Sequence, residues 1–524
     1  MISAYTNIEE FQNRSQKLAE IRALGIDPYP AKYVSTRKTS ELNIECEEQE
    51  VGHYDDAALG STQHVFVSGR IVLFRSMGKN AFVHIQDEAG RIQLLFNRDT
   101  TQVAGFEPTQ ELTTMKFLEK KLDLGDIVGI EGYLFRTQKG ELTVFAKMVT
   151  LLCKSLLPLP DKHSGLADKG VRYRKRWLDL ITHPESLERF RLRSRILWTI
   201  RKFFEEESFE EVETPVLQNL YGGAEARPFT THLNALSQDM YLRIALEIPL
   251  KKLIIGGMQR IYEIGKVFRN EGIDRSHNPE FTMLEAYASG WDYYDMMDLT
   301  ERLYVRIAND LFGDTKVKVV REGESDSIVI DLKAPWIRMS MKEAVKTYAK
   351  IDIDSMSDAQ IRTKLLKETE IEPQRVEKAT RGMLLAFLFE EFVEEHLIQP
   401  HHIIDHPIET TPLCKPHRDP LLRKEGLVER FESFLLGGEI CNSYTELNDP
   451  ELQRELLEAQ AKKRDEGDAE AHPLDEEFLE AICQGMPPTG GIGFGIDRLV
   501  MLFTSAHSIR DVLFFPLMRP ELDT

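Results

Sequence analysis

An arginine, a carboxylate and an aromatic ring lie near one another in the segment 267–287. Arg269 ends one expected strand and Phe281 lies on the next, so a β-hairpin would place both side chains on the same face. The fork of a guanidinium suits a phosphate, an aromatic ring can stack on adenine, and a carboxylate such as Glu271 can accept from an exocyclic amine. The segment therefore predicts a nucleotide site. The alternative interpretation is a hairpin with surface ion pairs.

A second candidate is the glycine-rich segment 490–495, which leads into Asp497 and Arg498. Glycines in a strand let another group approach the backbone closely. The strand is expected to run into a helix whose first turn presents Arg498. The alternative is a tight strand–helix junction that Asp497 caps. The sequence has no G-x-G-x-x-G after a strand and no G-x-x-x-x-G-K-[S/T], so a nucleotide site here is of another kind.

The elements that would position these residues do not alternate as strand, crossover helix and strand. Strands are expected at 238–246, 261–268, 280–289, 438–449 and 489–495. Their order favours a mainly antiparallel sheet with helices packed on it over a doubly wound parallel sheet. Within this part, residues 350–400 repeat apolar side chains at helical spacing, which predicts a helical insertion.

The stretch 64–152 has a different pattern. Five short β-type runs are expected, at 65–75, 81–86, 91–96, 126–135 and 142–149, with a helix at about 108–122. Three strands, a helix and two strands within ~90 residues is the order of an OB-type barrel. We therefore predict an α+β protein in four parts. They are a helical and extended segment (1–63), an OB-fold β-barrel (64–152), a basic hinge (153–185) and a domain with an antiparallel sheet flanked by helices (186–524).

Composition excludes several classes of protein. No apolar run approaches about 18 residues, so no membrane span is expected, and residues 1–20 lack the apolar core of a signal peptide. The five cysteines are scattered and form no C-x-x-C, which speaks against a disulfide framework or a cysteine-type zinc site. We expect reduced thiols and a cytoplasmic protein.

The net charge of −20 is unevenly distributed. Residues 65–150 carry 11 basic and 10 acidic groups, residues 151–200 carry 11 and 5, and residues 201–524 carry 38 and 60. Such a balance is unsuited to a protein that coats nucleic acid by charge alone. The basic cluster Lys169–Arg176 is interpreted either as a solvated or acid-packed linker, or as a contact with an anionic ligand across the domain junction.

Segments 267–287 and 490–498 resemble motifs 2 and 3 of the class II aminoacyl-tRNA synthetases, F-R-x-E and G-x-G-x-G-x-x-R, in that order. Phe209–Pro215 after a long helix resembles motif 1, the dimer-forming element with its proline, Pro215. An OB-type domain before the catalytic domain narrows the resemblance to the lysyl, aspartyl and asparaginyl enzymes. The whole chain from about 10 to 520 resembles this subgroup.

The charge of the amino-acid pocket distinguishes the lysyl, aspartyl and asparaginyl enzymes. An aspartate pocket needs fixed cations, whereas a buried ammonium group is costly unless carboxylates pair with it. The candidate pocket positions here are acidic: Glu247, Glu285 and Glu446. The chain therefore resembles the bacterial-type lysyl-tRNA synthetases, and an aspartate or asparagine enzyme is disfavoured.

The resemblance implies that ATP activates L-lysine to lysyl-adenylate, that lysine is transferred to the 3′ end of tRNA(Lys), and that the enzyme is a homodimer with Mg2+ as cofactor. It implies that Arg269 and Arg498 are the catalytic cations and that Glu432 and Glu439 hold the metal. The implied ATP site comprises Arg269, Glu271, His277, Asn278, Phe281, Glu432, Glu439 and Arg498. The implied lysine site has Gly223 and Glu247 at the α-amino group; around the side chain it has Glu285, Tyr287, Asn442, Tyr444 and Glu446.

The OB-type domain is implied to read the anticodon. OB folds bind single strands by aromatic stacking and polar contacts with base edges. The resemblance implies that Phe82 stacks on an anticodon base and that Arg75, Gln93 and Glu141 read base edges. The alternative for Phe82 is a place in the barrel core.

Two residues depart from the family pattern: Glu225 stands where a small neutral residue is usual, and Cys441 where Gly or Asn is usual. Two rival functions are considered less consistent with the sequence. A paralogue that attaches lysine to a protein lysine would lack the OB domain, and an inactive OB-type nucleic-acid binder would have lost Arg269, Arg498 or Glu439. Both are disfavoured because these features are present.

Overall fold

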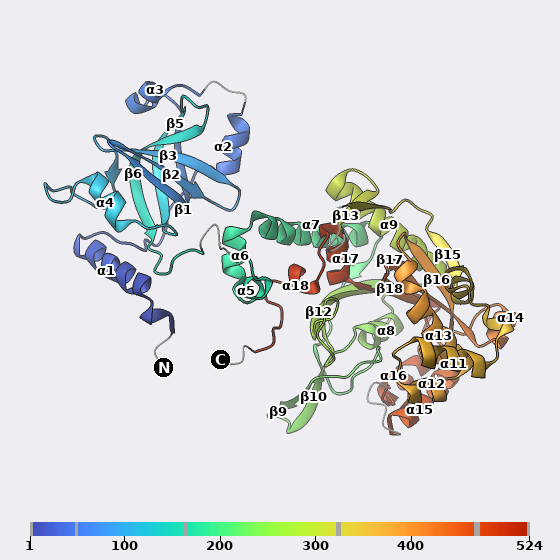
Figure 1. The fold of residues 1–524 in the computed structure, drawn as a ribbon. Coiled ribbons are helices and arrows are strands. Elements are labelled where there is room, and N and C mark those ends of the chain that lie inside the picture. The colour runs from blue at the N-terminus through green and yellow to red at the C-terminus, as the bar shows by residue number, and fades with distance from the viewer. Residues whose placement is uncertain (1–3, 48–50, 161–165, 321–325, 466–471, 521–524) are drawn as a thin grey trace. The chain divides into compact units, whose positions relative to one another are not determined.

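The computed structural model describes residues 4–47, 51–160, 166–320, 326–465 and 472–520. The chain divides into two compact units, 1–165 and 166–524 (Figure 1). Among the helices described, none has both the length and the apolarity that a membrane crossing needs.

The first unit is a closed β-barrel with helices around it. Its elements are a 3-10 turn (Ala4–Asn7), α1 (Glu9–Ala23), α2 (Thr39–Glu45), α3 (Tyr54–Leu59), β1 (His64–Met77), β2 (Asn80–Gln86), β3 (Arg91–Asn97), β4 (Gln102–Val103), α4 (Thr114–Lys121), β5 (Ile127–Arg136) and β6 (Leu142–Cys153). β1 pairs with β2 and β5, β2 with β3, and β5 with β6, all antiparallel. A parallel pairing of β3 with β6 closes the ring. The expected OB-type barrel is confirmed, with the short β4 as an addition.

Side-chain alternation on β2 shows why this segment is a strand. Ala81, Val83 and Ile85 are fully buried in the barrel core, and the intervening side chains point outward. At ~25 cal/mol per Å2 of apolar surface, burying such a row is what holds the strand in register.

The second unit is built on one large sheet. Its helices and strands up to residue 320 are α5 (Lys169–Arg174), α6 (Arg176–Thr182), α7 (Pro184–Glu206), β7 (Glu210–Glu211), β8 (Leu217–Gln218), β9 (Thr230–Leu233), β10 (Gln238–Leu242), α8 (Glu247–Ile255), β11 (Arg260–Phe268), β12 (Glu280–Ser289), α9 (Tyr293–Phe312) and β13 (Lys316–Val320). After it come β14 (Ser327–Asp331), β15 (Ile337–Ser340), α10 (Met341–Ala344), α11 (Asp358–Glu368), α12 (Pro373–Lys378), α13 (Arg381–Phe392), β16 (His401–Pro407), α14 (Pro420–Lys424), β17 (Leu427–Leu435), β18 (Gly438–Thr445), α15 (Pro450–Asp465), α16 (Glu476–Cys483), β19 (Thr489–Gly495), α17 (Ile496–Thr504) and α18 (Ile509–Val512).

The large sheet has the strand order β15-β16-β17-β18-β19-β12-β11-β7. Only the two edge pairs, β15 with β16 and β7 with β11, are parallel; the described central strands are antiparallel. The predicted antiparallel sheet flanked by helices is confirmed. α7, α9 and α17 pack on one face around a shared core that includes Phe204, Tyr304 and Leu499. The opposite face of the central strands is left for a cavity.

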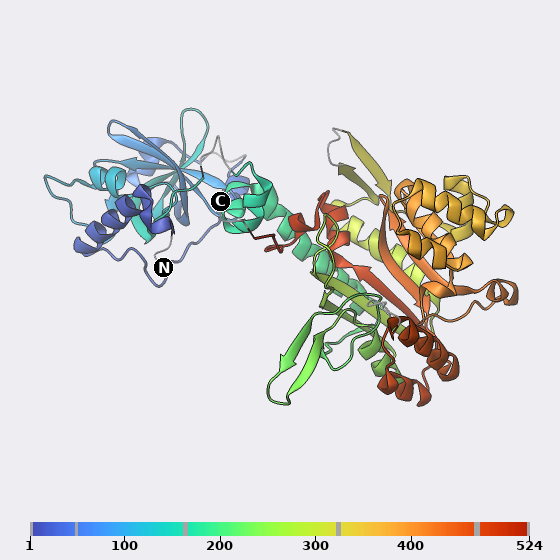
Figure 2. The ribbon, with the colours of Figure 1, turned by 60° about the horizontal axis from the view of Figure 1, so that its bottom comes forward.

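Residues 350–400 form the helical group α11, α12 and α13, which packs at the β15–β16 side of the sheet (Figure 2). Its own core includes Leu365, Leu388 and Phe389, and Ile403 and Phe434 of the sheet join it. Strands β13 to β17 were not predicted. β16 shows why: His401 and His402 are buried with hydrogen-bond partners, so its sequence lacks the simple apolar alternation of a strand.

The structure differs from the sequence-based prediction for the strand 238–246 and for the hinge 153–185. The expected strand 238–246 ends at Leu242, because Arg243 turns inward and donates to Glu263 at 2.6 Å and to the Thr214 carbonyl. The predicted hinge 153–185 is divided: 161–165 lie outside the described residues, and 169–182 form α5 and α6 within the second unit.

Candidate active site

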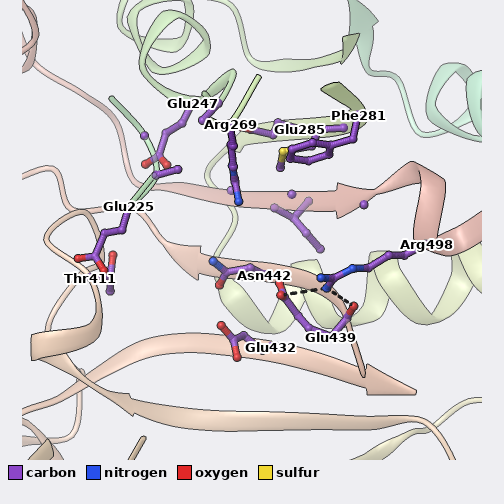
Figure 3. Close-up of a pocket in the computed structure, with 18 of the residues that line it drawn as sticks. Glu225, Glu247, Arg269, Phe281, Glu285, Thr411, Glu432, Glu439, Asn442 and Arg498 are labelled. Atoms are coloured by element: carbon purple, nitrogen blue, oxygen red, sulfur yellow. Dashed lines mark hydrogen bonds and ion pairs between the residues drawn. The ribbon is translucent and has the colours of Figure 1, made fainter. Parts of the chain in front are cut away.

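A cavity of about 360 Å3 opens on the face of the sheet formed by β12, β17, β18 and β19. Every residue that the sequence predicted for the ATP and lysine sites lines it. Several parts of the sequence therefore bring their polar side chains to one place, and Figure 3 shows Arg269 between Glu247 on one side and Arg498 on the other.

The β11–β12 hairpin positions the first cation. Val267 pairs with Phe281 in the register of this hairpin. Arg269, directly after β11, is therefore close enough for its side chain to lie over the Phe281 ring. The guanidinium carbon of Arg269 lies 5.2 Å from the centre of the Phe281 ring, and Nε donates to the Ile244 carbonyl at 3.4 Å. Burial lowers the pKa of Arg269, and the charges of Glu271, Glu439 and Glu285 oppose that shift. The ring and the guanidinium together provide an aromatic face and a positive charge, which suit a nucleotide.

The second cation comes from the glycine-rich strand. β19 ends at Gly495, and the first turn of α17 presents Arg498 to the cavity. Arg498 donates from Nη1 to the Glu439 carbonyl at 3.0 Å, and its Nη2 lies 3.3 Å from His277 Nε2. Asp497 does not cap this helix: its carboxylate accepts from the Thr282 amide at 2.8 Å and from Arg193 at 2.6 Å. It ties α17 and α7 to β12.

Glu432 and Glu439 come from the neighbouring strands β17 and β18 and line the same part of the cavity (Figure 3). Burial raises the pKa of Glu439, the negative charge of Glu432 raises it further, and Arg498 opposes the shift. Arg430 donates to Glu432 at 2.6 Å and to Asn442 at 3.0 Å. Among the described residues no group of three or more metal-binding side chains occurs. Two carboxylates under mutual repulsion suit a divalent cation whose other ligands are phosphate and water oxygens.

The acidic end is deeply buried. Glu285 accepts from the Leu246 amide at 2.8 Å and from the Tyr287 hydroxyl at 3.0 Å, and Tyr444 donates to Glu247 at 2.8 Å. Burial raises the pKa of Glu285 to about 7, with the charge of Glu247 as the next cause. Carboxylates held so far from water need a cation close by, which is the chemistry of an ammonium site.

Two glycines leave the room that this end requires. A Cβ at Gly491 would collide with Glu446 Oε1 and the Tyr287 ring. Gly223 has φ of +86°, where a side chain is strained, and a Cβ there would come within 2.9 Å of Glu247 Cβ. Both positions therefore exclude other residues.

Sequence reasoning missed a buried cation at the acidic end. Lys251, one helical turn after Glu247 on α8, forms ion pairs with Glu247 and Glu446 and is fully buried. The sequence contained a signal for it. Leu250 and Ile254 form the buried face of α8, and a lysine on the same face requires a partner of opposite charge. Arg430 on β17 was also missed, although Glu432, two residues further along the same strand, was among the predicted residues.

Cys441 and Glu225, the two residues that depart from the family pattern, differ in their position relative to the cavity. Cys441 is buried in the core on the side of β18 away from the cavity, 3.1 Å from Ser433 Oγ, so it does not border the site. Glu225 is exposed at the cavity wall, where Gln460 Nε2 lies 3.5 Å from its Oε1.

His472 also lines the cavity. Burial and, to a smaller extent, the charge of Lys251 lower the pKa of His472 to about 4.

In the barrel, the four predicted anticodon residues lie on or next to neighbouring strands, with Glu141 directly before β6. Arg75 and Phe82 are cross-strand partners on β1 and β2. Phe82 packs, partly buried, on a small cluster outside the main barrel core, so the structure does not support the core alternative. Gln93 donates to Glu141 at 2.7 Å and accepts from the Thr143 hydroxyl at 2.9 Å, so its amide is held in place from both ends.

The structure shows the surroundings of Pro215 and of the basic cluster Lys169–Arg176. Pro215 is exposed between the parallel edge pairing of β7 and the short β8. In the basic cluster, Arg172 and Arg176 pair with Asp179 at 2.6 and 2.7 Å. For these two arginines the structure supports the interpretation of a linker packed on an acidic neighbour.

Both units match known families. The family "tRNA synthetases class II (D, K and N)" matches residues 168–519, and the family "OB-fold nucleic acid binding domain" matches residues 65–152. The fold and the site thus define an enzyme of the class II tRNA synthetases that carries an OB-fold domain.

Curated relatives narrow this further. The lysine–tRNA ligase of Chlamydia felis is 55% identical over 516 residues, which cover 98% of both chains. The lysine–tRNA ligase of Trichormus variabilis is 45% identical over 97% of this chain and 87% of its own, and that of Staphylococcus epidermidis 45% over 98% and 99%. The chain belongs to this family of lysine–tRNA ligases.

Proposed function

We propose that the enzyme activates L-lysine with ATP to lysyl-adenylate and transfers the lysyl group to the 3′ end of tRNA(Lys). The observation that carries this proposal is the polarity of the cavity. Arg269, Phe281 and Arg498 form an end suited to a nucleoside triphosphate, and Glu247, Glu285 and Glu446 form an end suited to ammonium groups. Relatives of the same length carry the name lysine–tRNA ligase, which supports the same substrates.

No covalent nucleophile from the protein is needed. A carboxylate oxygen of lysine attacks the α-phosphorus, the bond from that phosphorus to the β-phosphate oxygen breaks, and pyrophosphate leaves. Arg269 lies at the junction of the two ends, where it neutralises the carboxylate and the α-phosphate as they approach, and Arg498 binds the outer phosphates. A terminal ribose hydroxyl of tRNA then attacks the lysyl carbonyl carbon, and AMP leaves.

The remaining residues orient the substrates. Phe281 stacks on adenine, while Glu271, Asn278 and His277 fix the base and the outer phosphates. Glu247 and the Gly223 carbonyl hold the α-amino group, and the ε-ammonium group lies among the acidic side chains of β12 and β18. Glu432 and Glu439 would hold Mg2+, which neutralises phosphate charge when bound.

We further propose that the barrel binds the anticodon through Phe82, Arg75, Gln93 and Glu141. We also propose a homodimer formed around Pro215, and a cytoplasmic location, where aminoacyl-tRNA is used. The separate barrel and the match to an OB-fold nucleic acid binding domain support the first of these.

The test is ATP–pyrophosphate exchange with each of the twenty standard amino acids in the absence of tRNA. We expect exchange with lysine. Exchange with aspartate or asparagine and none with lysine would overturn the assignment of the acidic end.

A further inference from the structure

Lys251 is a cation inside a site that we propose binds a cation. Its Nζ pairs with Glu247 and Glu446 and lies 5.5 Å from the centre of the Tyr444 ring and 5.9 Å from that of Phe478. The lysine side chain is fully buried, and Glu446 is 1% exposed. A charge so enclosed needs a reason, because burying an ion pair seldom stabilises a fold more than apolar residues of similar size.

The charges at the acidic end balance only when Lys251 is counted. Glu247, Glu285 and Glu446 carry three negative charges when ionised, and Lys251 offsets one. Two remain, which equals the number of ammonium groups on a lysine substrate, whose carboxylate faces Arg269. A ligand with two ammonium groups would then leave the buried end neutral.

Lys251 opposes the uptake of a proton by Glu446. Burial raises the pKa of Glu446, Glu247 and Glu285 raise it further, and Lys251 is the charge that lowers it. Glu446 Oε2 pairs with Lys251, whereas Oε1 has no hydrogen-bond partner among the residues described and lies beside Gly491. One oxygen is therefore held by Lys251, and the other is buried beside Gly491 at the cavity wall, without a hydrogen-bond partner among the described residues.

We propose that Lys251 is a specificity-determining positioning residue: it holds Glu446 and Glu247 as carboxylates so that their remaining oxygens receive the ammonium groups of the substrate. This inference rests on the proposed function, since it assumes that lysine is the substrate. The groups facing the pair from neighbouring elements are Glu247, Glu285, Tyr287, Tyr444, Cys414 and His472. Of these, the carboxylates favour a proton on Glu446, so Lys251 works against them.

The proposal predicts an effect opposite in sign to simple charge attraction. Removing a positive charge from a cation site should tighten cation binding if Lys251 were only a competitor. We expect the reverse: Lys251→Met raises the KM for lysine in ATP–pyrophosphate exchange at neutral pH by about tenfold or more, because Glu446 takes up a proton. The KM for ATP stays unchanged.

The pH profile separates this role from a structural one. In Lys251→Met, raising the pH from about 7 to about 9 ionises Glu446 again and lowers the KM for lysine, beyond any change in the wild type. The double variant Lys251→Met with Glu446→Gln lacks that recovery. Lys252→Met is the matched control: Lys252 is the next residue of α8, pairs with Glu477 at 2.8 Å outside the cavity, and is expected to leave the KM for lysine unchanged.

A measurement on the wild-type enzyme does not depend on any variant folding. Calorimetry of lysine binding at pH 8 in buffers of different ionisation heat gives the number of protons exchanged. Because Lys251 keeps Glu446 ionised, we expect less than about half a proton to be released. Release of a full proton, or a lowered KM for lysine in Lys251→Met, would overturn the proposal. Wild-type exchange that does not use lysine would overturn the proposed function instead.

Discussion

The guanidinium of Arg269 and the ring of Phe281 face each other across the β11–β12 hairpin, 5.2 Å apart. The arrangement places an aromatic ring next to a positive charge, so that a base and its phosphate can bind at neighbouring positions. The ring supplies stacking to the base, and the arginine supplies charge to the phosphate, so the two residues should affect different kinetic constants.

Replacing Phe281 is expected to weaken ATP binding. Stacking of a base on an aromatic side chain contributes about 1–3 kcal/mol, so Phe281→Leu should raise the KM for ATP by about tenfold, with a smaller change in kcat. Steady-state exchange with varied ATP measures this. Phe312→Leu, at an exposed phenylalanine at the end of α9, is the control and should behave like the wild type. A loss confined to kcat would contradict the stacking role.

Replacing Arg269 is expected to act on the chemical step. Arg269→Lys keeps a charge but loses the planar fork, so we expect kcat for lysyl-adenylate formation to fall by about a hundredfold or more. Single-turnover measurement of adenylate formation tests this. An unchanged rate constant at saturating ATP would place Arg269 outside the reacting groups.

Lysine binding should tighten as the pH rises through neutrality. The pKa of Glu285 is raised to about 7 by burial, so the side chain is neutral below that pH and charged above it. An ammonium ligand favours the charged form, so the Kd for lysine should fall by up to about tenfold per pH unit below pH 7 and level off above it. Isothermal titration with the wild type and Glu285→Gln measures this. The variant should bind lysine more weakly and without that pH dependence; an equally steep profile in the variant would assign the titration to another group.

Much of this molecule could be predicted from its sequence. The barrel strands, the hairpin 260–289 and the glycine-rich strand were predictable because their turns and alternation are local signals. Strand β17, which carries Arg430 and Glu432, was not, because its partners come from distant segments and its side chains serve a polar cavity. Lys251 was missed for a related reason: its role depends on Glu446, nearly two hundred residues away in sequence.

The two carboxylates on β17 and β18 should govern the need for a divalent cation. Removing metal with EDTA should abolish exchange, and Glu432→Gln should raise the Mg2+ concentration for half-maximal exchange by about tenfold or more. Glu432 raises the pKa of Glu439 but also accepts from Arg430 at 2.6 Å, so the melting temperature of the variant is measured beside the exchange. Glu425→Gln, at an exposed carboxylate just before β17, is the matched control. An unchanged Mg2+ requirement in Glu432→Gln would separate this residue from the metal.

The barrel and the catalytic site should be separable in function. Phe82→Ala is expected to weaken tRNA(Lys) binding by about 5- to 100-fold, since a stacked base contributes about 1–3 kcal/mol. Phe82 is only partly buried and lies outside the main barrel core, so the fold should survive the change. Exchange without tRNA is the internal control, because it requires only the second unit's cavity, and it should match the wild type.

Filter binding with intact tRNA(Lys) and with a tRNA of altered anticodon completes the test. The variant should lose most of the preference between the two tRNAs. If Phe82→Ala weakened both tRNAs equally and kept that preference, the ring would be a general contact and the reading of bases would lie elsewhere.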